Sequence, residues 1–362
     1  MKPLRVLVVR IGAMGDVLHA MPAVAALRER HPGCFIGWAI EPRWSDLLQI
    51  AGDSEDLSQG VGPTAAKALV DRWYSVPVSA WKRRPLAGAT LREIDVLRHL
   101  LKSERFDVCV DLQGSLKSAV VGRSAGAKVF VGAAEPRERL ARWLYGRRVR
   151  GTAPHVVEQA CEILGEAIAK PLHPAQSLHP AQPLRPAQVT LPMHARDELW
   201  ADRLVGQDRI CFLSPTAGWG AKIWPAERYG AVAAALGMAG FRVLVNASAG
   251  AEELADRVIA NSEGFAQPVT STIGQLIALL RRAAVVIAGD TGPLHLAAAL
   301  ERPVVGIYGP TTIARNGPWG TKSRVLRDAA SVTSHKRLSE PEPGLLRISV
   351  EQVVGAALEL LG

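Results

Sequence analysis

The chain of 362 residues lacks the features of several protein classes. Its only cysteines, Cys34, Cys109, Cys161 and Cys211, are far apart and have neither CxxC nor metal-ligand spacing. We therefore expect buried, reduced thiols rather than a disulfide framework. No run approaches the roughly 18 to 20 apolar residues that a membrane span requires. The apolar start of the chain is interrupted at Arg10 and is more typical of a first strand than of a signal peptide, which predicts a cytoplasmic protein.

Several catalytic and binding signatures are also missing. The phosphate-loop pattern GxxxxGK[ST] is absent, which disfavours ATP hydrolysis. There is no DxD-type acidic pair, no HExxH and no cluster of histidines, so no metal site is expected. No RNA- or DNA-binding signature accompanies the basic residues, and we expect no nucleic-acid partner.

The overall composition is typical of a soluble globular protein, and its charge is distributed unevenly along the chain. Hydrophobic residues make up 48% and charged residues 21% of the chain, and the formal net charge is +9. Residues 1–170 hold 25 Lys/Arg against 18 Asp/Glu, a balance of +7, which leaves +2 for the remainder. A basic front half suits an anionic partner, such as a membrane surface or a phosphorylated substrate, although net charge also serves solubility alone.

Apolar runs typical of buried strands alternate with segments of helical spacing along the chain. This alternation predicts an α/β protein with two doubly wound, mostly parallel sheets. Strands are expected at 4–9, 35–40, 108–112, 128–131, 210–213, 242–245, 285–288 and 304–307. Helices are expected at 17–30, 91–103, 116–123, 226–239, 251–260, 273–282 and 350–361.

A proline-rich stretch separates the two halves. Residues 170–192 contain three Pro-Ala-Gln units at six-residue spacing, a density of proline that prevents helix and central strand. We therefore expect an N-terminal Rossmann-like domain at 1–170, a linker at 171–192 and a C-terminal Rossmann-like domain at 193–345. The final segment, 346–362, is expected to pack back across the first domain. Domains of this kind bind ligands at the carboxyl ends of their strands, in a cleft between the domains.

The most informative stretch is VVIAGDTGPLHLAAAL, at 285–300. It predicts a buried strand, a tight turn and a helix with Pro293 in its first turn, where the missing N–H costs nothing. The free N–H groups of such a helix start suit a phosphate or a pyrophosphate. An ordinary turn capped by Asp290 or Thr291 is the alternative.

A second candidate anion site follows the first strand of the back half. Ser214, Thr216, Gly218 and Gly220 lie in a loop whose only cation is Lys222. A glycine-rich loop with one ammonium group at the end of a strand suits a phosphate. A solvated surface lysine is the alternative.

The first strand of the chain ends in VVRIGAMGD. Gly12 and Gly15 have the spacing of the end of a dinucleotide fingerprint, but Arg10 occupies the position of its first glycine, which weakens a cofactor site. The glycines instead form a turn that brings Asp16 to the edge of the cleft. There the carboxylate can act as a general base, or it can cap the following helix.

The front half contains two basic clusters. Lys82, Arg83 and Arg84 lie in a proline-flanked loop. In the second cluster, six arginines surround apolar and aromatic residues, a pattern that resembles an interfacial helix or, alternatively, a solvated helix face. Its members are Arg137, Arg139, Arg142, Arg147, Arg148 and Arg150, around Leu140, Trp143, Leu144 and Tyr145.

Four pieces together resemble the bacterial ADP-heptose:lipopolysaccharide heptosyltransferase family, which has the GT-B fold. They are VRIGAMGDVLHAMPAV at the start, DLQGSLKSA at Asp111–Ala119, the Thr216–Trp224 loop with its Lys-x-Trp-Pro end, and AGDTGPLHLAAAL followed by YGPT. They occur in the expected order over nearly the whole chain. The segment at 331–343 follows no pattern of the family.

The resemblance implies an inverting, metal-independent transfer of heptose from ADP-heptose to the Kdo-lipid A inner core of lipopolysaccharide. ADP-heptose is a substrate, and no cofactor is implied. The enzyme would be cytoplasmic and peripheral on the anionic inner face of the inner membrane. The N-terminal domain would bind the acceptor and the C-terminal domain the ADP-sugar.

The resemblance also implies a role for individual residues. Asp16 matches the catalytic base, and Lys222 matches the lysine that contacts the phosphates. The further donor-binding candidates are Thr216, Glu252 near the ribose, Asp290 and His295 along the sugar, and Thr291 and Gly292 at the diphosphate. The acceptor-binding candidates are Arg10, Lys82, Arg83 and Arg84.

Other hypotheses stay open at this point. The pieces favour the first heptosyltransferase, but transfer to a heptose acceptor by a second or third type is also compatible. An NAD-dependent oxidoreductase would need the glycine that Arg10 replaces. A two-lobed periplasmic binding protein would need a signal peptide. The sequence gives no prediction of the oligomeric state.

Overall fold

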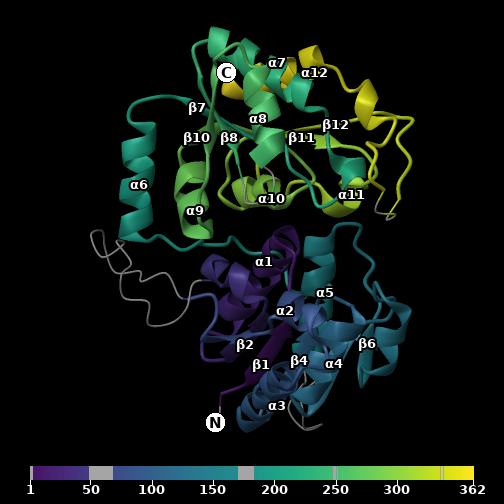
Figure 1. The fold of residues 1–362 in the computed structure, drawn as a ribbon. Helices are drawn as coiled ribbons and strands as arrows, with labels where there is room; N and C mark the ends of the chain where they lie inside the picture. Colours follow the sequence, from purple (N-terminus) through teal and green to yellow (C-terminus); the bar gives the residue numbers. More distant parts are fainter. Residues whose placement is uncertain are drawn as a thin grey trace. The chain divides into compact units, whose positions relative to one another are not determined.

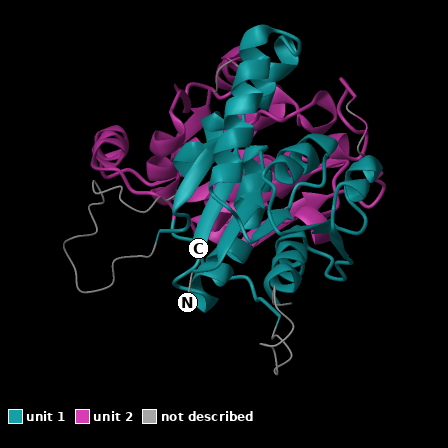
Figure 2. Cartoon of the chain, turned by 90° about the horizontal axis from the view of Figure 1, so that it is seen from below, with its two compact units in different colours: residues 1–54, 58–190 teal, residues 55–57, 191–362 magenta. Residues whose placement is uncertain are grey.

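The computed structural model describes residues 3–48, 68–169, 183–247, 250, 252–334, 336 and 338–362. They form two compact units: unit 1 contains the described residues up to 190, and unit 2 those from 191 onward (Figure 1 and Figure 2). The division falls inside the expected linker. Most of the Pro-Ala-Gln stretch, residues 170–182, lies outside the described residues, and 183–190 carry neither helix nor strand.

Unit 1 is built on a six-stranded parallel sheet in the order β3-β2-β1-β4-β5-β6. Its strands are β1 (Arg5–Val9), β2 (Phe35–Ile40), β3 (Arg72–Ser75), β4 (Val108–Asp111), β5 (Val129–Ala133) and β6 (Arg147–Val149). Its helices are α1 (Met14–Arg30), η1 (Pro42–Leu47), α2 (Val78–Arg83), α3 (Gly88–Ser103), α4 (Leu116–Ser124), η3 (Arg139–Trp143) and α5 (Val156–Ala169). The central strands are almost continuous apolar runs because helices cover both faces of the sheet.

Unit 2 repeats this plan with a parallel sheet in the order β12-β11-β10-β7-β8-β9. Its strands are β7 (Ile210–Ser214), β8 (Arg242–Asn246), β9 (Ala266–Val269), β10 (Ala283–Gly289), β11 (Val304–Tyr308) and β12 (Ser323–Arg327). Its helices are α6 (Ala195–Val205), η4 (Gly220–Lys222), α7 (Ala226–Met238), α8 (Glu252–Ala260), α9 (Ile273–Arg281), α10 (Gly292–Ala299), α11 (Ile313–Asn316), η5 (Leu345–Arg347) and α12 (Val350–Leu361). The expected α/β fold with two doubly wound parallel sheets is confirmed.

Each sheet has a point where the direction of winding reverses. In unit 1 the chain proceeds from β1 outward to β3 and then returns to β4 on the other side of β1. In unit 2 it proceeds from β7 to β9 and then returns to β10 beside β7. The loops that leave such neighbouring strands diverge, which opens a crevice at their carboxyl ends where open α/β sheets bind ligands.

The four strands that the sequence analysis missed, β3, β6, β9 and β12, are the edge strands of the two sheets. The strands β3 and β12 each lie at the end of a sheet and are only partly buried, so their sequences lack an apolar run. The interfacial helix expected around 137–150 is wrong. The structure has the short 3₁₀ helix η3 and the strand β6 there, because Arg147 pairs with Val131 in the sheet and Tyr145 is drawn into the core.

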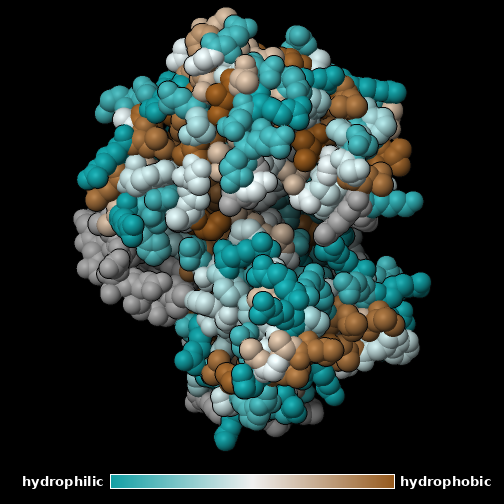
Figure 3. All heavy atoms as spheres, in the orientation of Figure 1, coloured by the Kyte–Doolittle hydropathy of each residue, from teal (hydrophilic) through white to brown (hydrophobic). Residues whose placement is uncertain are grey.

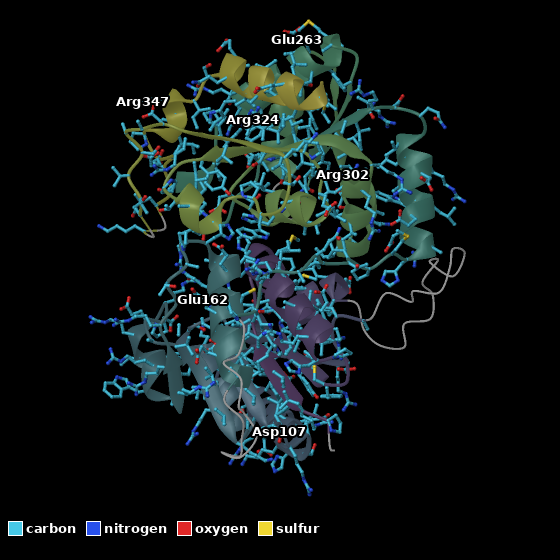
Figure 4. All side chains as sticks on the ribbon, turned by 180° about the vertical axis from the view of Figure 1, so that it is seen from behind. Asp107, Glu162, Glu263, Arg302, Arg324 and Arg347 are labelled. Carbon is cyan, nitrogen blue, oxygen red and sulfur yellow. The ribbon has the colours of Figure 1, made fainter. Side chains whose placement is uncertain are left out.

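The last helix, α12, belongs to unit 2. Its buried residues Val353, Ala356 and Ala357 lie in the hydrophobic core that also contains β7, β10 and α7. Arg324 of β12 (labelled in Figure 4) bonds to both carboxylate oxygens of Glu359, each at 2.8 Å. This corrects the expectation that 346–362 packs across the first domain: its apolar face completes the core of the domain that precedes it.

The four cysteines, Cys34, Cys109, Cys161 and Cys211, are buried and free. This is the state that their scattered spacing predicts. Burial raises the pKa of the Cys161 thiol to about 12, so it stays protonated at neutral pH.

Candidate active site

The polar centre of unit 2 lies where the winding of its sheet reverses. Lys222 ends the short helix η4, which follows β7, and Asp290 follows β10 directly. The Lys222 ammonium contacts the Asp290 carboxylate at 2.5 Å, and the two side chains are only 10% and 8% exposed. The two loops that the sequence analysis selected as separate anion sites therefore form one site.

His295 is the third member of this centre. Its Nε2 lies 2.9 Å from Oδ1 of Asp290, and its side chain is 4% exposed. It reaches Asp290 because it lies about one turn into α10, on the face that points back to the end of β10. Burial alone would raise the pKa of the Asp290 carboxyl, but the His295 and Lys222 partners outweigh burial and hold that pKa well below its usual range.

The start of α10 lies beside this centre. Thr291 has an extended backbone and precedes the helix, whose first two residues are Gly292 and Pro293. The Thr291 hydroxyl donates a hydrogen bond to the Gly289 carbonyl at 3.3 Å rather than capping the helix. The N–H groups of the first turn of α10 therefore keep the orientation that suits a phosphate.

The remaining donor-binding candidates lie at the same edge of the sheet. Thr216 is half-buried in the loop after β7, and the Lys222 ammonium of that loop lies 4.3 Å from the centre of the Trp219 ring. The ring face is a favourable neighbour for a cation and limits where Lys222 can point. Glu252 is exposed in the first turn of α8, which follows β8.

The carboxylate of Asp16 lies at the corresponding point of unit 1. Asp16 is in the first turn of α1, and its Oδ1 accepts a hydrogen bond from Arg10 Nη2 at 2.8 Å. Its Oδ2 accepts from the Ala13 N–H at 3.2 Å, and the side chain is 36% exposed. Asp16 thus interacts with the start of the helix and stays accessible.

Arg10 is engaged by groups of its own unit. Besides Asp16 Oδ1, its guanidinium donates to the Asp16 carbonyl at 2.9 Å and to the Leu112 carbonyl, and its side chain is 13% exposed. These contacts make it a neighbour of the candidate base and of the loop after β4. The expected contact of Arg10 with an acceptor has no support in this geometry.

A buried network that the sequence analysis did not select supports the same loops. Gln113 Oε1 accepts from the N–H groups of Ile11 at 2.6 Å and Gly12 at 3.3 Å. Asp111 holds the turn that presents Gln113, because it accepts hydrogen bonds from the Gln113 and Gly114 N–H groups.

The Asp111 carboxylate is itself fixed by buried hydroxyls. It accepts from Ser118 at 2.9 Å and from Tyr145 at 2.8 Å. Burial raises the pKa of this carboxyl in spite of its donors. The signal for the network was the piece DLQGSLKSA, which was noted for its resemblance to the family and not for its own chemistry.

The first basic cluster lies on a short helix rather than in a loop. Lys82 and Arg83 form the last turn of α2, Arg84 follows at its end, and all three are exposed. Lys82 also lies beside Lys117 of α4, and this neighbouring ammonium lowers the pKa of Lys117. Two adjacent lysines repel each other, so an anion placed between them would be favoured.

In the part of the chain that the structure describes, no group of three or more His, Cys, Asp or Glu side chains could hold a metal ion. The carboxylates of Asp290 and Asp16 are each paired with a Lys or Arg cation. Of the charged groups at the centre of unit 2, the ammonium of Lys222 is the one suited to bind a phosphate.

The chain is similar over most of its length to known proteins. Residues 94–343 match the model of glycosyltransferase family 9 (heptosyltransferase). The chain is 30% identical over 333 residues to lipopolysaccharide heptosyltransferase 1 of Escherichia coli strain K12, which covers 90% of this chain and 93% of the relative. Its similarity to lipopolysaccharide heptosyltransferase 2 of Salmonella typhimurium is limited to 120 residues at 33% identity, 31% of this chain and 34% of the relative. The solved structure of E. coli heptosyltransferase WaaC with ADP has a TM-score of 0.73 at 24% identity, covering 99% of this chain and 100% of that one.

Two Rossmann-like units with parallel sheets, each with polar groups where its winding reverses, give the chain a fold of the GT-B class. Within that class, the chain belongs to glycosyltransferase family 9, the heptosyltransferases. Family membership decides against the oxidoreductase and the two-lobed binding protein that the sequence analysis kept open.

Proposed function

We propose that this chain transfers heptose from ADP-L-glycero-D-manno-heptose to the Kdo-lipid A inner core of lipopolysaccharide, with inversion and without a metal ion. The observation that carries the proposal is the Lys222–Asp290–His295 centre beside the start of α10, in a chain that belongs to the heptosyltransferases. The similarity of the fold to a heptosyltransferase structure that contains ADP supports a nucleoside diphosphate as the leaving group.

In the proposed reaction, unit 2 binds the donor. The Lys222 ammonium and the N–H groups of Thr291 and Gly292 neutralise the negative charge that develops on ADP as the glycosidic bond breaks. Asp290 orients Lys222 and, with His295, hydrogen-bonds hydroxyls of the heptose. Thr216 contributes a hydroxyl from the same loop as Lys222.

Glu252 completes the proposed donor site, at the ribose. Its support is its place in the first turn of α8, after the strand next to β7. Carboxylates at the strand ends of Rossmann-like sheets hydrogen-bond ribose hydroxyls.

Unit 1 supplies the proposed base. Asp16 takes the proton of an acceptor hydroxyl as its oxygen attacks the anomeric carbon from the face opposite to ADP, and the electron pair of the broken bond leaves on the diphosphate. Arg10 orients Asp16 through its two-point contact with the residue, which replaces the acceptor-binding role that the sequence analysis gave it. Lys82, Arg83 and Arg84 bind the carboxylate and phosphate groups of the acceptor.

We propose activity of the first type, on Kdo-lipid A. The relative named heptosyltransferase 1 aligns over nearly the whole chain at 30% identity, whereas the relative named heptosyltransferase 2 aligns over about a third. A relative named heptosyltransferase 3 also aligns over 96% of the chain, but at 22% identity. Transfer to a heptose acceptor, as in the second or third type, remains the competing function.

The direct test is to incubate the purified protein with ADP-heptose and Kdo-lipid A, with and without EDTA, and to follow ADP release and the mass of the lipid. We expect one heptose added per acceptor at a rate that EDTA does not change. A parallel reaction with heptosylated Kdo-lipid A tests the competing function. Turnover of that acceptor alone would overturn the assignment to the first type, and loss of activity in EDTA that Mg²⁺ restores would overturn metal independence.

We also propose that the enzyme is cytoplasmic and docks on the anionic inner face of the inner membrane. Among the described residues, no helix combines the length and apolar character of a membrane span. Unit 1 nevertheless exposes large apolar side chains, including Leu86 at 85%, Leu140 at 65% and Trp143 at 68%. The guanidinium groups of Arg142 and Arg148 lie 5.1 and 5.4 Å from the Trp143 ring centre. In Figure 3, hydrophobic residues lie among hydrophilic ones over the part of unit 1 around α4 and β6.

Apolar side chains between arginines are the composition that favours an anionic lipid surface. We expect the protein to sediment with vesicles that contain phosphatidylglycerol, and this binding to fall with salt and in Trp143→Ser. Met238→Ser changes an equally exposed apolar residue of unit 2 and serves as the control. Vesicle binding that changes neither with salt concentration nor in Trp143→Ser would refute this docking surface.

A further inference from the structure

The segment from Ser331 to Leu345, which we call the clasp segment, packs against the helix η4 that carries Lys222. Its residues 335 and 337 lie outside the described residues. The Ala221 N–H donates to the Leu338 carbonyl at 3.0 Å, and the Ala221 carbonyl accepts from the Glu342 N–H at 3.2 Å. The residue directly before Lys222 is therefore held through both of its backbone groups by a part of the chain more than a hundred residues away.

The neighbouring glycine shows how close this approach is. A Cβ added to Gly220 would lie 1.6 Å from the Ser339 carbonyl oxygen and 2.3 Å from its carbon. These are backbone atoms, so only a large displacement of the clasp segment could make room. The close approach of the clasp segment therefore requires glycine at position 220.

The carboxylate of Glu342 connects the two ends of the clasp segment by hydrogen bonds. It accepts hydrogen bonds from the Ser331 hydroxyl at 3.0 Å, the Val332 N–H at 3.1 Å and the Leu345 N–H at 2.9 Å. Burial alone would raise the pKa of the Glu342 carboxyl, but these donors outweigh it and lower the pKa. The ionised carboxylate therefore joins the two ends of the segment that contacts Ala221.

The clasp segment also contacts the loop after β11. The Ser334 N–H donates to the Pro310 carbonyl at 2.9 Å. At Gly309, an added Cβ would meet Leu345 Cβ at 3.1 Å, Glu342 Oε2 at 3.4 Å and the Ala221 carbonyl at 3.5 Å. The loops that follow β7 and β11 are thus fixed to the same segment, on either side of β10, which Asp290 directly follows.

We propose that Glu342 is a positioning residue for the transfer reaction: through the clasp segment it fixes η4 so that Lys222 meets the diphosphate of the donor. The proposal deepens the proposed function and rests on it. Glu342 touches neither Lys222 nor Asp290 in the structure, so its effect passes through the backbone of Ala221. A segment to which the sequence analysis gave no role thereby acquires one in donor binding.

The test is a double-mutant cycle read out by the affinity for ADP. Isothermal titration with ADP is carried out on the wild type, Glu342→Gln, Lys222→Ala and the double variant. Gln keeps the size of Glu342 but replaces one acceptor oxygen by a donor that faces the N–H groups. We expect about a tenfold weaker affinity in Glu342→Gln, since bonds to charged groups are the stronger ones. In the Lys222→Ala background the same change has little further effect, because the two residues act through one contact.

Glu340→Gln is the matched control, since Glu340 is exposed two residues away in the same segment and carries the same charge. Ser331→Ala removes a single donor to Glu342 and serves as the milder variant should Glu342→Gln fail to fold; we expect a smaller loss of ADP affinity that likewise depends on Lys222. Two results would overturn the positioning role: an equal loss of ADP affinity in the wild-type and Lys222→Ala backgrounds, or no loss of ADP affinity in either Glu342→Gln or Ser331→Ala. A wild type that does not bind ADP would instead overturn the proposed function itself, and the inference with it.

Discussion

Replacing Lys222 by Met tests how the centre of unit 2 is held together. Met keeps the length of the side chain and removes its charge. Asp290 then retains His295 as its partner but loses the ammonium at 2.5 Å, and it remains 8% exposed. The change therefore leaves a buried carboxylate with only one of the two partners that stabilise its negative charge.

The magnitude follows from the burial of the pair. Removing one partner of a buried ion pair costs about 3 to 5 kcal/mol, whereas replacing both by neutral residues of similar volume is often close to neutral. Because His295 still bonds to Asp290, we expect the lower end, about 3 kcal/mol, for Lys222→Met. In the double variant Lys222→Met, Asp290→Asn the amide keeps a bond to His295 and no charge is left unpaired. The double variant should therefore recover most of the stability that Lys222→Met loses.

The assay is urea unfolding of the wild type, Lys222→Met and the double variant, followed by tryptophan fluorescence at several pH values. The folded pKa of Asp290 lies below its unfolded value of about 4, so the stabilisation is complete above that value and is lost as the pH falls through the folded pKa. In Lys222→Met the carboxylate takes up a proton more readily, which relieves the unpaired charge. The difference from the wild type should therefore be largest near pH 7 and shrink below about pH 4.

Two results would refute this reasoning. Equal stability of Lys222→Met and the wild type at pH 7 would show that the ion pair contributes nothing. A double variant no more stable than Lys222→Met would show that the loss comes from packing and not from an unpaired carboxylate.

Three further changes test the other centres. Asp16→Asn should lower kcat by roughly 10² to 10⁴-fold while the affinity for ADP stays unchanged; near-normal turnover would remove Asp16 as the base. Arg10→Gln should lower kcat with little change in KM for the donor, and a change confined to KM for the acceptor would return Arg10 to acceptor binding. Tyr145→Phe removes the 2.8 Å bond to the buried Asp111 and should cost about 1 to 3 kcal/mol of stability by urea unfolding; an unchanged midpoint would show that this hydroxyl is not needed.

The sequence predicted the central strands well because their signal is local. A strand buried on both faces is an apolar run, and the positions expected for β1, β2, β4, β7 and β10 lie within two residues of those observed. Edge strands such as β3 and β12 carry charged residues on their exposed faces and have no such signal. Tyr145 shows a further limit of prediction from sequence. Its position among arginines suggested a membrane interface, but its hydroxyl instead donates a hydrogen bond to the carboxylate of Asp111, 34 residues earlier.

Individual residues of the candidate site could be selected from the sequence, but their arrangement in space could not. Lys222 was selected for a phosphate and Asp290 for the donor sugar, from loops 68 residues apart, and only the structure shows that they touch. The clasp segment could not be predicted, because its contacts with Ala221 and Pro310 are made through backbone atoms that any sequence supplies. Glycine at 220 was visible in the sequence, but the backbone that excludes a side chain there was not.

The two carboxylates at the switch points are suited to different tasks, although each is paired with a cation. Asp290 is buried, bonds to two partners, and has a pKa held well below its usual range, so a proton on either oxygen would displace the partner bound there. It can therefore orient Lys222 but cannot take a proton from a hydroxyl near neutral pH. Asp16 is 36% exposed, and its partners Arg10 and Ala13 lie within its own loop and leave part of the carboxylate open to a substrate. The difference in exposure, rather than in residue type, is what supports the proposal that unit 1 carries out proton transfer and unit 2 charge stabilisation.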